Sequence, residues 1–228
     1  MGDKICVIPA RSGSKRVIRK NIKNFYGKPL ICWTIDSAIK SNLFSQIIVS
    51  SDDDELLKLA KNLNVTAFKR FNYTDDLSTS SEATIFTLKN CNINLKNDTT
   101  IFQLLPTCPL RTSADINVAY QKYKQKKLIS GVSCYKMNFG NPHWLMKKKL
   151  NGNIEFIFPD LLEKRSQDLD HLFLLSGCVW ISQYKFLLEN NSFKGDRTGF
   201  LDLNWLSCLD IDTEEEFRIT EHLASLVY

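Results

Sequence analysis

Residues 5–16 read ICVIPARSGSKR, and the triplet Arg19-Lys20-Asn21 follows shortly after. The short apolar run up to Pro9 has the length and composition of a buried strand. After Pro9 the residues are mostly small, hydroxylated or cationic. Backbone N–H groups beside glycine and serine can approach phosphate oxygens closely, and cations neutralise the phosphate charge. The stretch therefore predicts a strand that ends in a loop able to bind a polyanion.

This loop matches neither of the two common glycine-rich phosphate motifs. It cannot be aligned with GxxxxGK[ST], and it has a single glycine where the dinucleotide fingerprint GxGxxG has several. A solvated basic loop without a ligand is the alternative interpretation. The position directly after the first strand favours a ligand, because ligands of open α/β sheets gather at the carboxyl ends of strands.

Strands and helices alternate along the rest of the chain. The sequence predicts strands at residues 5–9, 46–50, 65–68, 100–105, 131–135 and 177–182. It predicts helices at residues 29–40, from 51–55 to about 62, from a cap at Ser80 or Ser81 to about 91, 113–126 and 213–226. The last of these helices is expected to be capped by Thr213, with Glu214, Glu215 and Glu216 in its first turn. Repeated strand–helix rounds are typical of an α/β fold, here a Rossmann-like, doubly wound, mostly parallel sheet covered on both faces.

The alternation changes in the middle of the chain. Residues 144–150 and 153–158 flank Asn151-Gly152, a pair that favours a tight turn between two strands. We expect a single domain over residues 1–228, from which residues from about 138 to 170 leave the sheet as a β-hairpin excursion. Such an excursion suits a lid or a dimerisation arm.

Composition narrows the class of partner and the compartment. A net charge of +5 over 228 residues suits an anionic small molecule, and no basic stripe with interleaved aromatics predicts nucleic-acid binding. The seven cysteines are odd in number and form no CxxC pair, so neither a zinc site nor a disulfide framework is indicated. With no signal peptide and no apolar run near the ~20 residues of a membrane helix, we expect a cytoplasmic protein without membrane binding.

A second signal lies near the end of the chain, at Leu209-Asp210-Ile211-Asp212-Thr213. In an extended segment, residues two apart face the same side, so Asp210 and Asp212 would project together. Two such carboxylates repel each other unless a proton or a cation lies between them. Mg²⁺ suits the pair, because it prefers one or two carboxylates together with phosphate oxygens and water. Alternatively, Asp212 only precedes the last helix.

Two weaker signals fall at other predicted strand ends. Pro106-Thr-Cys-Pro-Leu-Arg111 follows a strand and, with two prolines, predicts a rigid loop at the carboxyl edge of the sheet. Lys69-Arg70 precedes the hydroxyl-rich start of a helix at residues 79–81, where a cation and a helix N-terminus could meet a nucleotide. Each of these two segments alone is equally compatible with an ordinary loop.

Together these motifs resemble the CMP-sialic acid synthetases, the acylneuraminate cytidylyltransferases. The matching segments span nearly the whole chain in the order of that family: residues 8–15, 19–21, 27–30, 48–52, 106–111, 166–169 and 209–213. The resemblance implies transfer of CMP from CTP to the anomeric hydroxyl of a sialic-acid-like nonulosonate, a nine-carbon 2-keto sugar acid, with release of pyrophosphate. It also implies Mg²⁺ as cofactor, a homodimer, and a CMP-sugar used in surface glycan (lipopolysaccharide or capsule) synthesis.

The resemblance also assigns roles to residues. Arg11, Lys20, Asp210 and Asp212 would be catalytic, with the two aspartates as metal ligands. Nucleotide binding would fall to Ala10, Arg11, Ser14, Lys15, Lys20, Asn21, Arg70 and Ser81. Sugar binding would fall to Gln103, Leu105, Thr107, Arg165, Ser176 and Trp180, with Arg165 acting in the partner's site.

The chain departs from the family pattern in the sugar half. Leu105 stands where the family commonly has glutamine before Pro-Thr, while Gln103 lies two residues earlier. Ser176-Gly-Cys-Val-Trp180 stands where the family commonly reads Asn-Gly-Ala-Ile-Tyr. Polar groups of a site discriminate strongly between close substrates, so the acceptor sugar is where we expect this chain to differ. A keto-deoxy-octulosonate cytidylyltransferase and a non-catalytic nucleotide-binding protein remain the alternatives.

Overall fold

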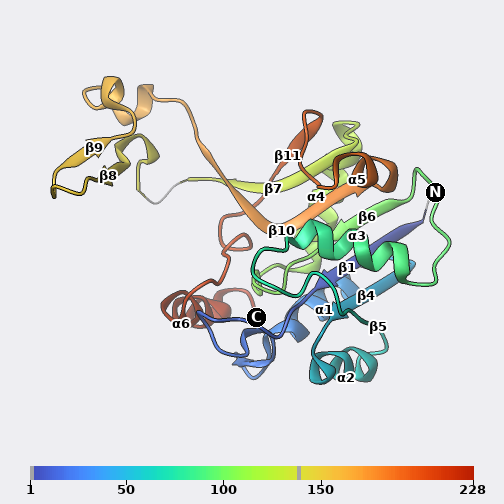
Figure 1. The fold of residues 1–228 in the computed structure, drawn as a ribbon. Helices are drawn as coiled ribbons and strands as arrows, with labels where there is room; N and C mark the ends of the chain where they lie inside the picture. Colours follow the sequence, from blue (N-terminus) through green and yellow to red (C-terminus); the bar gives the residue numbers. More distant parts are fainter. Residues whose placement is uncertain (1–2, 138–139) are drawn as a thin grey trace.

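A computed structural model describes residues 3–137 and 140–228. Within them, one sheet has the strand order β11-β7-β10-β6-β1-β4-β5 (Figure 1). Its strands are β1 (Lys4–Pro9), β4 (Gln46–Ser51), β5 (Thr66–Lys69), β6 (Thr100–Gln103), β7 (Ser130–Lys136), β10 (Phe173–Gln183) and β11 (Thr198–Asp202). Only β10 runs antiparallel to its neighbours β6 and β7. The predicted α/β class with a mostly parallel sheet is confirmed.

The helices follow the strands closely in sequence. They are α1 (Leu30–Lys40), α2 (Asp54–Asn62), α3 (Ser80–Asn90), α4 (Ser113–Gln125), α5 (Tyr184–Asn190) and α6 (Glu214–Leu223). Short 3-10 turns lie at Lys20–Ile22, Pro142–Trp144, Pro159–Leu161, Ser166–Asp168 and Ala224–Leu226. The short antiparallel pairs are β2 (Asn24–Phe25) with β3 (Lys28–Pro29) and β8 (Met146–Lys148) with β9 (Ile154–Phe156).

Three helices begin with a capping box, in which the cap side chain and an acid three residues later satisfy each other's backbone N–H. The caps are Thr79, Thr112 and Thr213. The prediction of Ser80 or Ser81 as the cap of α3 was wrong, because only Thr79 has the required acid, Glu82, three positions on. The predicted acidic first turn behind Thr213 is confirmed.

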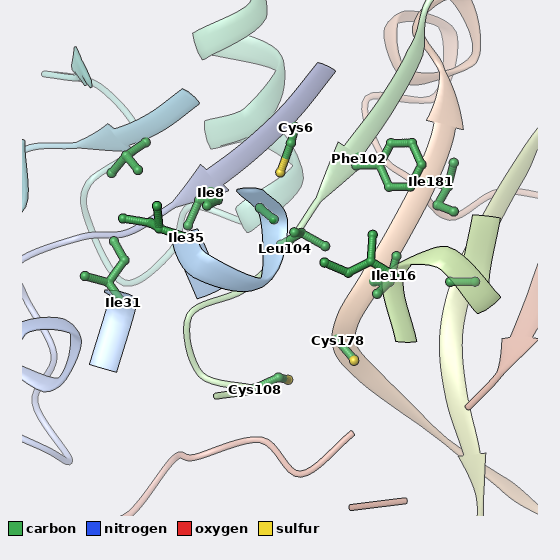
Figure 2. Close-up of a cluster of buried hydrophobic side chains, with 14 of the residues drawn as sticks. Cys6, Ile8, Ile31, Ile35, Phe102, Leu104, Cys108, Ile116, Cys178 and Ile181 are labelled. Carbon is green, nitrogen blue, oxygen red and sulfur yellow. The ribbon is translucent and has the colours of Figure 1, made fainter. Parts of the chain in front are cut away.

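Apolar residues cover both faces of the sheet, as predicted. Cys6 and Ile8 of β1 face one layer and pack in a cluster with residues of α1, α2 and α4 (Figure 2). Ile5 and Val7 point the other way, into a cluster with α3 and α5. Successive side chains of a strand alternate between faces, so one apolar run supplies both layers.

The predicted hairpin excursion is present. Met146 pairs with Phe156 and Lys148 with Ile154, and Gly152 adopts a φ of +85° in the connecting turn. Figure 1 shows β8 and β9 well away from the sheet. The expected start of the excursion at residues 138–139 lies outside the described residues. No helix in the described ranges is long and apolar enough to cross a membrane.

Candidate active site

A cleft of about 530 Å³ opens where β1, β5 and β6 end at the carboxyl edge of the sheet. Its lining comes from segments far apart in sequence. The lining residues are Pro9, Arg11, Ser14, Lys15, Arg16, Lys20, Asn21, Arg70, Tyr73, Asp76, Ser78, Thr79, Ser80, Ala83, Leu105, Pro106, Thr107 and Asp212. The structure thus brings together the basic loop, one of the two aspartates and the loop after β6.

The basic loop is anchored by buried residues and by one carboxylate. Ala10 is buried, and its N–H donates to the carbonyl of Ser50 at 2.9 Å. The backbone N–H and the hydroxyl of Ser12 both donate to Asp52, at 2.8 and 2.6 Å. Asn21 donates to the carbonyl of Arg11 at 3.0 Å. The cationic side chains therefore extend from a loop whose backbone is already positioned.

Two cations of this loop share one carboxylate. Arg11 lies 2.7 Å from Asp76, and Lys15 pairs with the other oxygen of the same carboxylate. Hydrogen bonds from Lys15 and Arg11 hold the pKa of Asp76 below its usual value. Asp76 lies in the segment between β5 and α3. It is not among the predicted site residues, because nothing in its local sequence pattern links it to the basic loop.

Asp210 and Asp212 flank a buried residue. Ile211 is fully buried, and its N–H donates to the carbonyl of Thr107 at 2.9 Å. It packs in a cluster with Val17 of the basic loop, so the two ends of the chain are held together beneath the cleft. Asp212 accepts from Arg16 at 2.8 Å.

Lys20 connects the basic loop to the aspartates. Its ammonium group donates to the carbonyl of Ile211 at 2.5 Å and lies 3.6 Å from Asp212. Burial lowers the pKa of Lys20, while the charges of Asp212 and Asp210 act in the opposite direction. Lys20 is the most enclosed cation of the loop, with 11% of its side chain exposed against 80% for Lys15.

Asp210 carries the second carboxylate of the pair. The residue is exposed, but loss of hydration around its carboxyl group is the main reason why its pKa is raised. The nearby charge of Asp212 raises it further, and a hydrogen bond with the Thr107 side chain lowers it. Two close carboxylates, one of them with a raised pKa, form a set of oxygen donors that suits a hard divalent cation. Among the described residues, no group of three or more histidines, cysteines and acids gathers around a common point.

Arg70 lines the cleft directly after the end of β5. It is buried, its N–H donates to the carbonyl of Ser51 at 2.8 Å, and its guanidinium donates to the carbonyl of Tyr73. Its Nε has no hydrogen-bond partner within the described chain. Burial lowers its pKa. Ser81 is buried, whereas its neighbour Ser80 lines the cleft.

The residues predicted to bind the sugar are not all at the cleft. Leu105 and Thr107 line it. Gln103 is fully buried between Ser80 and Thr84, and Ser176 donates to the carbonyl of Cys208 at 2.8 Å.

Trp180 and Arg165 also lie outside the set of cleft-lining residues. Trp180 packs in the core against Phe193, and its indole N–H donates to the carbonyl of Ser176 at 2.7 Å. Arg165 is exposed on the excursion. The single chain therefore places two of the six predicted sugar residues in the cleft.

Known proteins resemble this chain in sequence and in fold. The family model described as "Cytidylyltransferase" matches residues 5–142. A pseudaminic acid cytidylyltransferase of Campylobacter jejuni is 30% identical and is aligned over 96% of this chain and 95% of its own length. A CMP-N,N'-diacetyllegionaminic acid synthase of Legionella pneumophila is 31% identical, over 97% and 96%.

A solved structure of CMP:2-keto-3-deoxy-manno-octonic acid synthetase, complexed with CTP, superposes with a TM-score of 0.71 over 99% of both chains. Its sequence is 14% identical, so this likeness shows the fold alone. The family model covers more than half of the chain and the two relatives nearly all of it. The chain thus belongs to the cytidylyltransferase family, as a nucleotidyltransferase related to the CMP-nonulosonate synthetases.

Proposed function

We propose that this protein transfers CMP from CTP to the anomeric hydroxyl of a nine-carbon 2-keto sugar acid, releasing pyrophosphate and forming a CMP-sugar. The observation that carries the proposal is the meeting of several cations and a carboxylate in one cleft. Arg11, Lys15 and Lys20 line the cleft together with Asp212, and the ammonium group of Lys20 lies 3.6 Å from that carboxylate. Asp210 lies two residues before Asp212 in the chain. The names of the two sequence relatives support the sugar class.

In this proposal each cation has its own task. Arg11, Ser14 and Lys15 hold the triphosphate, and Asn21 keeps the loop in place through the carbonyl of Arg11. Lys20 neutralises charge that builds on the leaving pyrophosphate, since its ammonium is fixed and little hydrated. Arg70 forms the nucleoside side of the site, where Ser80, the neighbour of the buried Ser81, also lines the cleft.

Asp210 and Asp212 are the residues that would hold Mg²⁺. At these carboxylates the ion would neutralise phosphate charge and lower the pKa of the attacking hydroxyl. The carboxylates themselves orient the acceptor side of the cleft, because Thr107 contacts both Asp210 and the backbone of Ile211. The remaining Mg²⁺ ligands would be phosphate oxygens and water.

We further propose a cytoplasmic homodimer that serves surface glycan synthesis. The excursion carries exposed apolar side chains, among them Trp144, Leu145 and Ile154, and β10 adds Phe173 and Leu174 where it leaves the sheet. Apolar groups exposed in such number favour a partner surface. Arg165 on the same excursion would then act in the partner's site. Sedimentation equilibrium of the full chain tests the dimer, and a monomer at micromolar concentration contradicts it.

The activity is tested by pyrophosphate release from CTP. The acceptor panel contains N-acetylneuraminate, pseudaminic acid, N,N'-diacetyllegionaminic acid and keto-deoxy-octulosonate, each with Mg²⁺ and with excess chelator. Release with a nine-carbon acid and Mg²⁺ supports the proposal. Release with the octulosonate alone would move the substrate to the eight-carbon class, and CTP binding without any release would indicate the non-catalytic alternative.

A further inference from the structure

Leu105 presents an apolar wall at the end of β6. It lines the cleft directly before Pro106 and Thr107. Its backbone is fixed on both sides, since its N–H donates to the carbonyl of Gly177 at 3.2 Å and its carbonyl accepts from Arg111 at 3.1 Å. The side chain is half-buried. Its position is therefore defined by the fold.

Gly177 leaves the space that the Leu105 side chain fills. A Cβ placed on Gly177 would lie 2.3 Å from Cδ1 and 2.9 Å from Cγ of Leu105, closer than such atoms approach. The glycine lies where the pairing of β10 with β7 shifts register, between Leu175 and Trp180. A side chain at Gly177 would have to displace Leu105, so the two residues form one unit.

Gln103 does not replace the missing glutamine beside this wall. Gln103, the nearest amide along the strand, donates to the hydroxyl of Ser80 at 3.0 Å and accepts from Thr84 at 2.7 Å. The residue is 0% exposed. Its polar atoms are used within the protein, which leaves Leu105 as an apolar surface toward the cleft.

Leu105 lies on the acceptor side of the proposed reaction centre. Thr107, two residues later, contacts Asp210 through its side chain and Ile211 through its carbonyl. The phosphate cations follow β1, the neighbour of β6 in the sheet, and Arg70 follows β5, three strands away from β6. An acceptor hydroxyl that reaches the carboxylates from the β6 side must bring part of the sugar past Leu105.

We propose that Leu105, seated on Gly177, is a specificity-determining residue that contacts an apolar carbon of the acceptor. The inference rests on the proposed function and narrows its substrate class to deoxygenated nonulosonates. In these acids, a methyl or methylene carbon stands where N-acetylneuraminate has a carbon that bears a hydroxyl. A hydroxyl placed against Leu105 loses water and gains no protein partner. An apolar surface of this kind can discriminate between two such acceptors by roughly 100-fold in kcat/KM.

The test compares acceptors within one protein and then across variants. kcat/KM with CTP and Mg²⁺ is measured for pseudaminic acid, N,N'-diacetyllegionaminic acid and N-acetylneuraminate. The wild type should prefer a deoxygenated acid over N-acetylneuraminate by roughly 10- to 100-fold. Leu105→Gln should reduce that ratio about tenfold or more, while Leu105→Met, which keeps volume and polarity, should preserve it. Leu226→Gln, at an exposed leucine outside the set of cleft-lining residues, is the matched control.

The outcomes separate this inference from the proposed function. Pyrophosphate release with an unchanged ratio in folded Leu105→Gln, or a wild-type preference for N-acetylneuraminate, overturns the role of Leu105 alone. CTP binding without release on any acid overturns the proposed function and this inference with it. Thermal melting and the KM for CTP check that the variants are folded, and Leu105→Ala, which also removes the apolar contact, takes the place of Leu105→Gln should that variant not fold.

Discussion

Arg11 lies 2.7 Å from Asp76, and the second oxygen of that carboxylate pairs with Lys15. Two cations proposed to hold the triphosphate are thus neutralised by a carboxylate of the chain itself. The three side chains are 37%, 43% and 80% exposed for Arg11, Asp76 and Lys15, so water screens both pairs. Triphosphate, with more charge than one carboxylate, can displace Asp76 at a modest cost.

Asp76→Asn should therefore tighten CTP binding by up to about fivefold, because the nucleotide no longer competes with a carboxylate. Isothermal titration calorimetry at low and moderate salt checks this, and the gain should shrink as salt rises. Asp75→Asn is the control, since Asp75 bonds to Ser78 of its own loop. Weaker CTP binding in Asp76→Asn would show instead that Asp76 contributes to the bound state.

Lys20→Ala and Lys15→Ala should separate chemistry from binding. Lys20 is enclosed and fixed by the carbonyl of Ile211, so its loss should lower kcat by roughly 100-fold, with a smaller change in CTP affinity. Lys15 is largely exposed, so its loss should raise the KM for CTP more than it lowers kcat. Steady-state kinetics with both variants decides between these roles. If the two variants showed the same changes in kcat and in KM, the division of roles between Lys20 and Lys15 would be contradicted.

Local pattern predicted the fold where a segment carries its own signal. The apolar run before Pro9 and the amphipathic spacing of α1 needed no partner to be recognised. β11 and α5 were missed for the opposite reason. β11 contains Gly199, and it pairs with β7 in an arrangement where a Cβ at Gly199 would lie 2.4 Å from Leu128. Such a strand is stabilised by its neighbours rather than by its own composition.

The candidate site likewise contains features that a local sequence pattern reveals and features that it does not. The two-residue spacing of Asp210 and Asp212 around one apolar residue is visible in the sequence, and the residue between them, Ile211, is buried. The pairing of Arg11 with Asp76, 65 positions apart (76 − 11), leaves no local pattern. Gln103 was predicted to bind the sugar because it lies two residues before Leu105 on the same strand. Its amide is instead held by Ser80 and Thr84 of α3, and this contact depends on a helix that is distant from Gln103 in the sequence.

Asp212→Asn should lower turnover by roughly 100-fold or more while the fold persists, because the proposed Mg²⁺ loses one of two carboxylates. The midpoint of the Mg²⁺ dependence of pyrophosphate release should move to higher concentration. Calorimetric titration of Mg²⁺ into the CTP-saturated protein gives a readout independent of turnover. Asp196→Asn, at an exposed loop position, is the control. A turnover close to that of the wild type would remove the metal role.

Tyr123 should make stability fall at alkaline pH. Burial raises the pKa of Tyr123 to about 12 from 10.0, and Tyr120 nearby adds to the effect. The folded state then holds the phenol proton more tightly than the unfolded state does. Its stabilising contribution is complete below pH 10 and is lost as pH rises from about 10 to about 12. The loss amounts to about 2–3 kcal/mol, since each pKa unit corresponds to about 1.4 kcal/mol.

Tyr123→Phe should remove this part of the alkaline slope, because phenylalanine fills the same core position without a titrating group. The variant should be less stable by about 1 kcal/mol at neutral pH, since the phenol donates to the carbonyl of Ile129 at 3.1 Å. Urea unfolding at pH 8, 10 and 11.5 measures both effects, with Tyr26→Phe at an exposed position as the control. Parallel pH curves for wild type and Tyr123→Phe would show that this phenol does not carry the alkaline loss, and the raised pKa would then have no consequence for stability.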